Sequence, residues 1–163
     1  MRPRTLLATG LAVTTTAVVG GLASRPAQSS WYRRLRKPPY QPPRQVFPVV
    51  WPVLYADIAA VAASALDDLD DLATPDRERQ RRAYIGALSA NLVLNAGWSW
   101  LFFDRRRLGL SAAAAGVLAV SSADLTRRSV AASGAKAAPV AAYAAWTAFA
   151  TVLSTHIWML NRG

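Results

Sequence analysis

The sequence predicts an all-α protein, an integral membrane bundle of five transmembrane helices. The chain has 163 residues, of which 53% are hydrophobic and only 17% are charged, and its basic residues gather between long uncharged stretches. A helix needs roughly 20 mostly apolar residues to cross a bilayer. Five stretches meet this requirement: 5–23, 46–66, 83–103, 108–126 and 137–160. We therefore expect residues 1–163 to form one membrane domain.

The first stretch, 5–23, follows Arg2 and Arg4, and a charged start before an apolar run is also typical of a secretory signal peptide. This stretch of 19 uncharged residues is longer than the usual apolar core of a signal peptide. We interpret it as a membrane helix, with the signal peptide as the alternative.

The second stretch is preceded by a 22-residue loop, 24–45, and six of the ten prolines of the chain lie between 38 and 52. Proline fixes its own φ angle and restricts the residue before it. We expect a stiff, extended loop that lies as a lid across one end of the bundle. The alternative is a rigid connector with an interfacial aromatic belt of Trp31, Tyr32 and Tyr40.

The remaining connections predict which helices are neighbours. Only residues 104–107 separate the third and fourth stretches, so these two helices should be adjacent and antiparallel. Thr74-Pro75-Asp76 has the order of a helix start, with a capping hydroxyl before a first-turn proline. The acidic run 67–71 is interpreted as the solvated end of the second helix.

Several classes of function are excluded by what the sequence lacks. It contains no cysteine and one histidine, so we expect neither a metal site nor a cofactor. The net charge of +10 would favour nucleic acid in a soluble protein, but basic residues lie on both membrane sides, nine against ten, so we expect no nucleic-acid binding. The same tie leaves the orientation open. No catalytic residue set is recognisable.

Three ionisable residues other than tyrosines lie inside the uncharged stretches, where such groups are candidates for function. Asp124 precedes Arg128 by four residues, which predicts an interfacial ion pair. Asp57 lies deeper and is expected to be neutral or paired with a neighbouring helix. His156 is expected to present its ring to water.

The proline-rich region carries the most distinctive pattern: Trp31-Tyr32-x-x-Leu35-x-Lys37-Pro38, then Pro42-Pro43, then Val46-Phe47-Pro48-x-x-Trp51-x-x-Leu54-Tyr55. Later blocks read Leu94-Asn95-x-x-Trp98-Ser99-x-x-Phe102-Phe103 and Tyr143-x-x-Trp146. The pattern resembles the TspO/MBR family, the tryptophan-rich sensory proteins related to the mitochondrial translocator protein (peripheral benzodiazepine receptor). The resemblance spans nearly the whole chain and implies a five-helix bundle.

Helical spacing places Trp51 and Tyr55 on one face of helix 46–66, and Asn95 and Trp98 on one face of helix 83–103. In the same way, Trp146 shares a face of helix 137–160 with Phe149. The resemblance implies a ligand pocket between these faces and beneath the loop, whereas packing is the alternative interpretation for any one tryptophan. The implied ligand-binding residues are Trp31, Tyr32, Pro42, Pro43, Trp51, Tyr55, Asn95, Trp98, Tyr143 and Trp146. For Asn95 a helix–helix polar contact is an alternative role.

The resemblance implies binding of porphyrins (protoporphyrin IX, haem-related tetrapyrroles) and similar apolar ligands, for sensing, transport or a stress response. Such a ring stacks on indole, and its propionates need cationic partners. The loop offers Arg33, Arg34, Arg36, Lys37 and Arg44. The alternative is light- and oxygen-dependent breakdown of protoporphyrin, with Trp51 and Trp146 as the oxidisable residues. The tyrosine of the cholesterol motif of animal relatives is absent, so sterol binding is not expected.

Three positions depart from the family pattern: Gln45 stands at a frequently aromatic position, Ala142 at a proline and Ser154 at an asparagine. Small residues on helix 83–103 (Ala83, Gly86, Ala87, Ala90) would allow close approach of another helix, so we expect a possible homodimer through this helix. The alternative is packing on helix 108–126. The expected location is the lipid bilayer, as a multi-pass protein of the plasma (inner) membrane of a bacterium.

Overall fold

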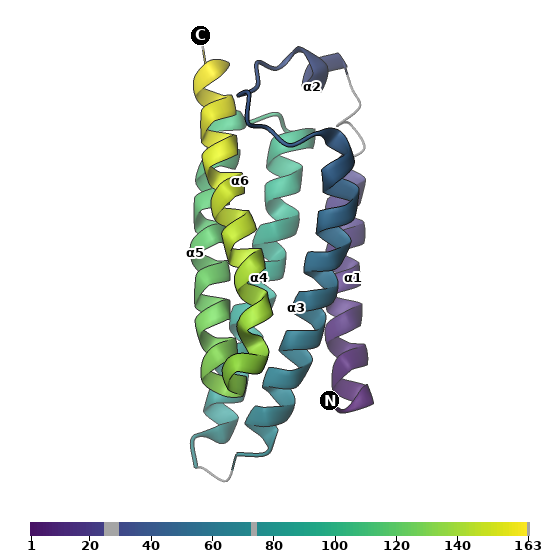
Figure 1. Ribbon diagram of the computed structural model, residues 1–163, viewed down its shortest axis with the longest axis vertical. Helices are drawn as coiled ribbons and strands as arrows, with labels where there is room; N and C mark the ends of the chain where they lie inside the picture. Colours follow the sequence, from purple (N-terminus) through teal and green to yellow (C-terminus); the bar gives the residue numbers. More distant parts are fainter. Residues whose placement is uncertain (25–29, 73–74, 163) are drawn as a thin grey trace.

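The computed structural model describes residues 1–24, 30–72 and 75–162, and the described chain is built from helices. Five long helices stand side by side, and the short α2 lies across one end of the bundle (Figure 1). The helices are α1 (Pro3–Ser24), α2 (Ser30–Arg34), α3 (Phe47–Asp70), α4 (Arg77–Ser99), α5 (Leu108–Ser133) and α6 (Ala141–Leu160). The short segments are η2 (Arg44–Val46) and η4 (Gly134–Val140), both 3₁₀, and the π-helical η3 (Trp100–Asp104). The predicted all-α class with five long helices is confirmed.

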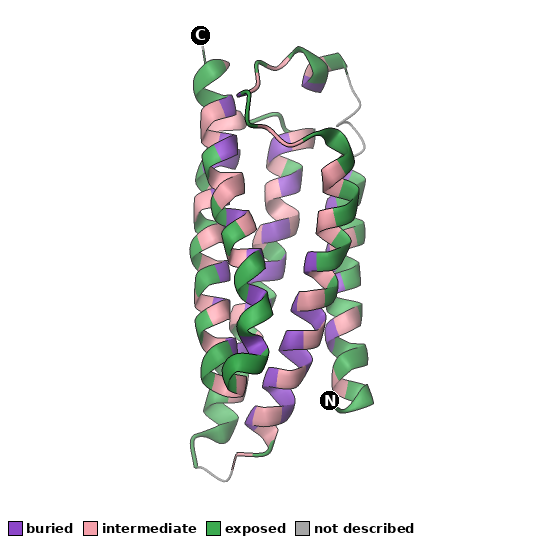
Figure 2. Ribbon diagram, in the orientation of Figure 1, coloured by how far each residue is buried: buried purple, intermediate pink, exposed green. Residues whose placement is uncertain are grey.

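The helices pack in an order that only partly follows the short connections. α1 packs against α3 and α4, α4 packs against α5, and α5 makes its most extensive contact with α6. The expected antiparallel pair of helices around residues 104–107 is confirmed as α4 and α5 (Figure 1). Buried residues form stripes that face the interior of the bundle (Figure 2).

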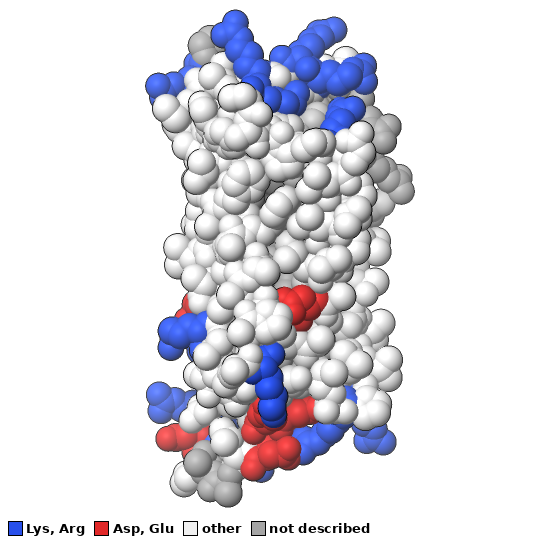
Figure 3. Space-filling view, in the orientation of Figure 1, with Lys and Arg blue, Asp and Glu red and all other residues white. Residues whose placement is uncertain are grey.

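The surface of the bundle suits a bilayer. Helical stretches 3–24, 44–70 and 108–160 are long and apolar enough to cross a membrane. The third of these contains α5 and α6, which fold back on each other and therefore cross twice (Figure 1). Lys and Arg gather at the two ends of the molecule, and the band between them is largely free of charge (Figure 3). Several of the side chains exposed along the helices are large and aliphatic, among them Leu7, Leu11, Val53, Val93, Val120 and Val152.

Four helices extend beyond the predicted spans, α1 by one or two residues at each end and three others by more. α3 continues to Asp70 instead of residue 66, α4 begins at Arg77 instead of residue 83, and α5 continues to Ser133 instead of residue 126. Charged residues end the segment that can lie in the bilayer, but they do not end the helix, because arginine and glutamate favour helices in water. Residues 137–140, by contrast, are 3₁₀ and not α-helical. Thr74 lies outside the described residues, and the side chain of Asp76 does not cap α4.

The acidic end of α3 is a set of inter-helix contacts, which corrects the expectation of a merely solvated terminus. The buried carboxylate of Asp67 accepts hydrogen bonds from the Arg2 amide and from the Thr5 hydroxyl, the latter at 2.6 Å. The Arg2 guanidinium pairs with Asp70 and Asp71. We call Arg2, Thr5, Asp67, Asp70 and Asp71 the ionic clasp. It ties the start of α1 to the end of α3.

At the opposite end, α4 widens into the π-helical turn η3. The Arg105 amide donates to the Trp100 carbonyl at 2.9 Å, a bond across five residues. Arg106 then ends the turn with a φ of 54°, in the left-handed region, and its guanidinium carbon lies 5.3 Å from the centre of the Trp31 ring. The turn thereby directs consecutive aromatic side chains, Phe102 and Phe103, toward α2.

The loop between α1 and α3 covers this end of the bundle, but it is not extended throughout as expected, because it contains α2 and η2. Its middle is fastened to α6. The Arg36 amide donates to Asn161 Oδ1 at 3.0 Å, and Asn161 Nδ2 donates to the Arg36 carbonyl at 2.9 Å. Tyr40 Oη lies 2.9 Å from His156 Nδ1, so the His156 ring is half-buried under the loop and not simply exposed to water.

The other intramembrane acids differ in their partners. Asp124 binds Arg127 and Arg128 at 2.7 and 2.5 Å, which confirms the expected ion pair with Arg128 and adds a second arginine. Asp57 is half-buried, and its Oδ2 has no hydrogen-bond partner among the described residues.

Candidate ligand cavity

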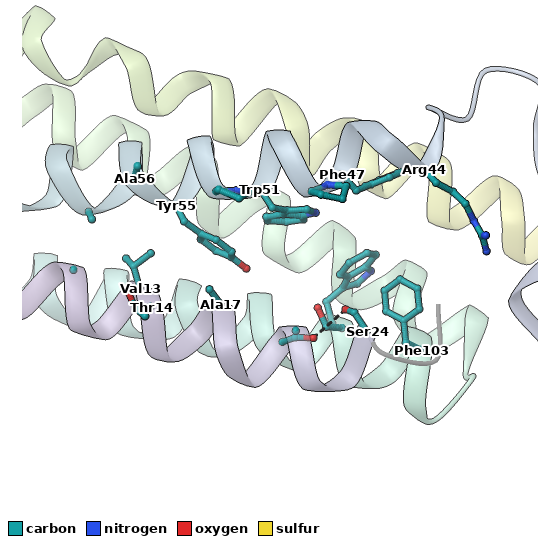
Figure 4. Close-up of a pocket in the computed structure, with 18 of the residues that line it drawn as sticks. Val13, Thr14, Ala17, Ser24, Arg44, Phe47, Trp51, Tyr55, Ala56 and Phe103 are labelled. Carbon is teal, nitrogen blue, oxygen red and sulfur yellow. Dashed lines mark hydrogen bonds between the residues drawn. The ribbon is translucent and has the colours of Figure 1, made fainter. Parts of the chain in front are cut away.

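A cavity of about 1030 Å³ lies between α1 and α3 at the lid-covered end of the bundle. Its lining runs along α1 from Gly10 to Ser24, a length of about 21 Å at 1.5 Å per residue. Below it, the Thr9 hydroxyl donates to the Ala59 carbonyl at 2.9 Å and brings the two helices together. Figure 4 shows Trp51 and Tyr55 projecting from α3 into this space, toward α1.

The α1 wall consists mainly of small residues, which the sequence-based site did not include. They recur every three or four residues and so share one face of the helix: Gly10, Val13, Thr14, Ala17, Gly20, Gly21 and Ser24. A Cβ atom added at Gly21 would meet nothing within 4 Å. The signal that could have found this wall is the periodicity of small residues along 10–24.

The facing walls are aromatic. The rings of Trp51 and Tyr55 lie 5.4 Å apart on α3, and the Trp98 ring stacks on Phe102 at 5.6 Å with 29° between their planes. Phe47 and Phe103 also line the cavity. The buried indole N–H of Trp98 has no hydrogen-bond partner in the described part of the chain. The cavity therefore offers flat apolar surfaces.

Two arginines of the loop region, Arg33 and Arg44, form the rim. The Arg44 guanidinium carbon lies 5.7 Å from the centre of the buried Tyr32 ring, and the Lys37 ammonium lies 4.6 Å from the same centre. Burial raises the pKa of the Tyr32 hydroxyl, although a hydrogen bond from Gln41 and the charge of Arg44 oppose the shift. Burial, together with the charge of Arg44, lowers the pKa of Lys37.

Lys37 is held inside the loop and does not line the cavity, because its ammonium donates to the carbonyls of Tyr32 and Leu35 at 2.5 and 3.2 Å. Arg34 and Arg36 do not line it either. Of the five basic residues expected near a ligand, Arg33 and Arg44 are thus the two at the rim.

A chain of buried hydrogen bonds leads from the cavity wall into the bundle. The Tyr55 hydroxyl donates to Asn95 Oδ1 at 2.8 Å, and Asn95 Nδ2 donates to the Tyr143 hydroxyl at 3.0 Å. The Tyr143 hydroxyl donates to Asn91 Oδ1 at 2.9 Å, and Asn91 Nδ2 donates to Ser122 Oγ at 3.1 Å. This polar chain joins α3, α4, α6 and α5, and it satisfies the amides that α4 carries at bilayer depth.

The structure brings four of the ten sequence-predicted site residues to the cavity: Tyr32, Trp51, Tyr55 and Trp98. Asn95 and Tyr143 lie behind Tyr55 in the polar chain. Trp146 lies behind the cavity wall, with its ring 6.0 Å from that of Phe47.

The remaining predicted residues belong to the lid. Trp31 packs edge-on against Phe102 at 6.2 Å, and Pro42 and Pro43 belong to the loop segment between α2 and η2. Among the positions that depart from the family pattern, Gln45 and Ala142 are exposed and Ser154 is buried, and none of them lines the cavity.

The fold and the cavity define a multi-pass helical membrane protein that encloses a large aromatic pocket under a loop. The chain belongs to the TspO/MBR family, whose model matches residues 8–159. It is 29% identical to the translocator protein of Ovis aries, over 82% of this chain and 76% of the relative. It is 26% identical to the tryptophan-rich protein TspO of Bacillus cereus, over 83% and 84% of the two chains, and 29% identical to protein CrtK of Rhodobacter capsulatus, over 90% and 88%.

Proposed function

We propose that this protein binds porphyrins, such as protoporphyrin IX and haem-related tetrapyrroles, and similar apolar ligands in the cavity between α1 and α3, for sensing, transport or a stress response. The observation that carries the proposal is the combination of aromatic walls with two arginines at one rim. This pattern fits a ligand with a wide π surface and carboxylates at one edge.

The cavity also fits such a ligand in shape. Its volume is at the upper end of the roughly 300–1,000 Å³ that small-molecule sites occupy. The small residues of α1 form a smooth wall opposite Trp51, so a flat ring can lie between them. The propionates would then face Arg33 and Arg44.

Titration of the purified protein with protoporphyrin IX tests this proposal, with quenching of tryptophan fluorescence as the readout. Gly21 lines the cavity and a Cβ atom there would meet nothing within 4 Å, so Gly21→Leu should narrow the cavity and weaken binding. Leu11→Phe is the matched control, because Leu11 is 68% exposed on α1 and does not line the cavity. Equal affinities for wild type and Gly21→Leu would contradict the assignment of the site.

A second candidate function is light- and oxygen-dependent degradation of protoporphyrin in the same pocket. The observation in its favour is that Trp51, and Trp98 across from it, present oxidisable indoles to the cavity. The measurement is the loss of Soret absorbance under illumination in air. If the Soret absorbance falls no faster than that of free pigment, the degradation proposal is contradicted and only the binding proposal remains.

We also propose that α4 forms a homodimer interface. Gly86 and Ala90 are exposed, and a Cβ atom at Gly86 would meet nothing within 4 Å, so this face is not used by α5 within the chain. Gly86→Leu and Ala90→Leu should therefore abolish crosslinked dimers in membranes while the folded monomer survives. A dimer that persists in both variants would place the interface elsewhere.

The proposed location is the plasma (inner) membrane of a bacterium. Relatives in Bacillus cereus and Rhodobacter capsulatus support this location, although translocator proteins of mammals match as well. Separation of inner and outer membranes of the source organism, followed by immunodetection, is the direct test.

A further inference from the structure

A second hollow, of about 360 Å³, lies at the end of the molecule opposite the lid. It is bounded by the end of α3, the first turns of α4 and the last turns of α5. Three arginines line it, Arg79 from α4 with Arg127 and Arg128 from α5, and Gln80 adds an amide. Its apolar side is formed by residues that include Ala83 and Ala131.

The arginines of α5 are held in place from behind. Asp124, which does not line the hollow, accepts from Arg127 Nη2 at 2.7 Å and from Arg128 Nε at 2.5 Å. A guanidinium has five N–H donors, so both groups keep donors for another partner. The Arg79 guanidinium forms no hydrogen bond or ion pair with any residue that the structure describes. Asp76 also lines the hollow, and with Asp124 it leaves one positive charge in excess.

The hollow lies at the depth where a phospholipid carries its phosphate. Ala83 is the first residue of the uncharged stretch of α4, and Arg127 directly follows the uncharged stretch 108–126 of α5. The lining therefore spans the boundary between the charged helix ends and the apolar band: Ala83 begins the apolar stretch of α4, whereas Ala131 follows Arg127 and Arg128 toward the end of α5. Basic pockets between helices at this level suit anionic headgroups, and guanidinium groups bind phosphate through paired hydrogen bonds.

We propose that this hollow binds the phosphate of an anionic glycerophospholipid headgroup. The excess positive charge favours phosphatidylglycerol over phosphatidylcholine, whose quaternary ammonium would be repelled by the same arginines. The site is separate from the porphyrin cavity at the other end of the bundle, so its test does not depend on the proposed porphyrin binding.

The test uses the full-length protein in detergent micelles, with phosphatidylglycerol, phosphatidylcholine or inorganic phosphate added, and native mass spectrometry to count retained ligands. Arg79→Gln removes an unpaired, exposed charge and should weaken retention of phosphatidylglycerol about fivefold, the effect of roughly one interfacial charge. Ala131→Phe fills the exposed wall without changing charge and should weaken it as well. Arg82→Gln is the control, because Arg82 pairs with Glu78 outside the hollow.

Preferential retention of phosphatidylglycerol that both variants lose and the control keeps would support the site. Equal retention of the two lipids, or variants that retain phosphatidylglycerol like wild type, would overturn it. Inorganic phosphate that is retained at concentrations similar to those of phosphatidylglycerol would also overturn it, since the ligand would then be a free anion. Unchanged far-ultraviolet circular dichroism shows that the variants have folded.

Discussion

The two ends of the bundle are held together by different kinds of contact. At the clasp end, α1 and α3 are joined by charged hydrogen bonds around the buried Asp67. At the lid end, the same two helices leave a cavity between them, and the contacts that close it are mostly between aromatic rings, such as Tyr32 with Phe102 and Phe103.

This difference implies that substitutions at the clasp end mainly affect stability, whereas substitutions at the lid end mainly affect ligand binding. A buried charge that loses its partners is costly, so single substitutions at the clasp end should lower the free energy of unfolding more than those at the lid end. The aromatic end is already hollow, and substitutions there remove ligand contacts more than native packing. The predictions that follow use the two ends as controls for each other.

The largest expected effect is that of Asp67→Ala on stability. The substitution leaves the Arg2 amide and the Thr5 hydroxyl without their acceptor, which should cost about 1.5–3 kcal/mol. Thermal unfolding in detergent micelles measures it. Asp71→Ala, which removes an exposed partner of Arg2, should cost less than about 1 kcal/mol. Similar losses in both variants would show that burial of the clasp does not matter.

The second effect concerns affinity alone. Trp51→Phe removes an indole from the cavity wall and should weaken protoporphyrin binding by about 0.5–1.5 kcal/mol. Trp146→Phe should weaken it less, because Trp146 reaches the cavity only through Phe47. Fluorescence titration of the two variants and of the double variant gives the comparison. An unchanged affinity in the double variant would contradict the cavity as the binding site.

A smaller effect is expected in the polar chain between the two ends. Tyr143→Phe removes one acceptor and one donor and should lower stability by about 0.6 kcal/mol for each lost bond, the mean for hydrogen bonds between membrane helices. Tyr84→Phe breaks a single bond, to Ser129, and should cost about half as much. Because neither residue lines the ligand cavity, protoporphyrin affinity should stay at the wild-type value in both.

The smallest effect is on the rate of ligand release. Asn161→Ala removes two exposed hydrogen bonds that hold the lid to α6, and a loss of about 0.5 kcal/mol corresponds to roughly twofold faster dissociation. Replacement of Pro38, Pro39, Pro42 and Pro43 by alanine should act in the same direction and leave the helices intact. Arg162→Ala is the control, since Arg162 stacks on Trp158. Unchanged dissociation rates would make the loop a simple connector.

The fold could be predicted because charge interrupts the sequence at the ends of every span. The same signal misplaced the helix ends, since Arg77–Arg82 and Arg127–Ser133 continue their helices beyond the apolar band. The solvated interpretation of residues 67–71 failed because the partners of Asp67, Arg2 and Thr5, lie more than 60 residues away in the chain.

The aromatic half of the candidate site could also be predicted, because Trp51, Tyr55 and Trp98 follow helical spacing and a recognisable motif. The α1 wall could not be predicted, because its glycine and alanine residues contribute to the site by leaving space and not by contacts of their own side chains. The position of Trp146 relative to the cavity depends on how closely α6 approaches α3. The spacing of residues within α6 carries no information on that distance.

The π-helical turn η3 has a consequence for insertions and deletions. A turn with bonds across five residues holds one residue more than a regular turn of the same helix. Deleting one residue from 100–104 would give this turn α-helical spacing, with one residue fewer between the same two backbone groups. The side chains within the turn would then point in other directions, so Phe102 and Phe103 would lose their places beside Tyr32. This turn should therefore tolerate substitution better than a change of length.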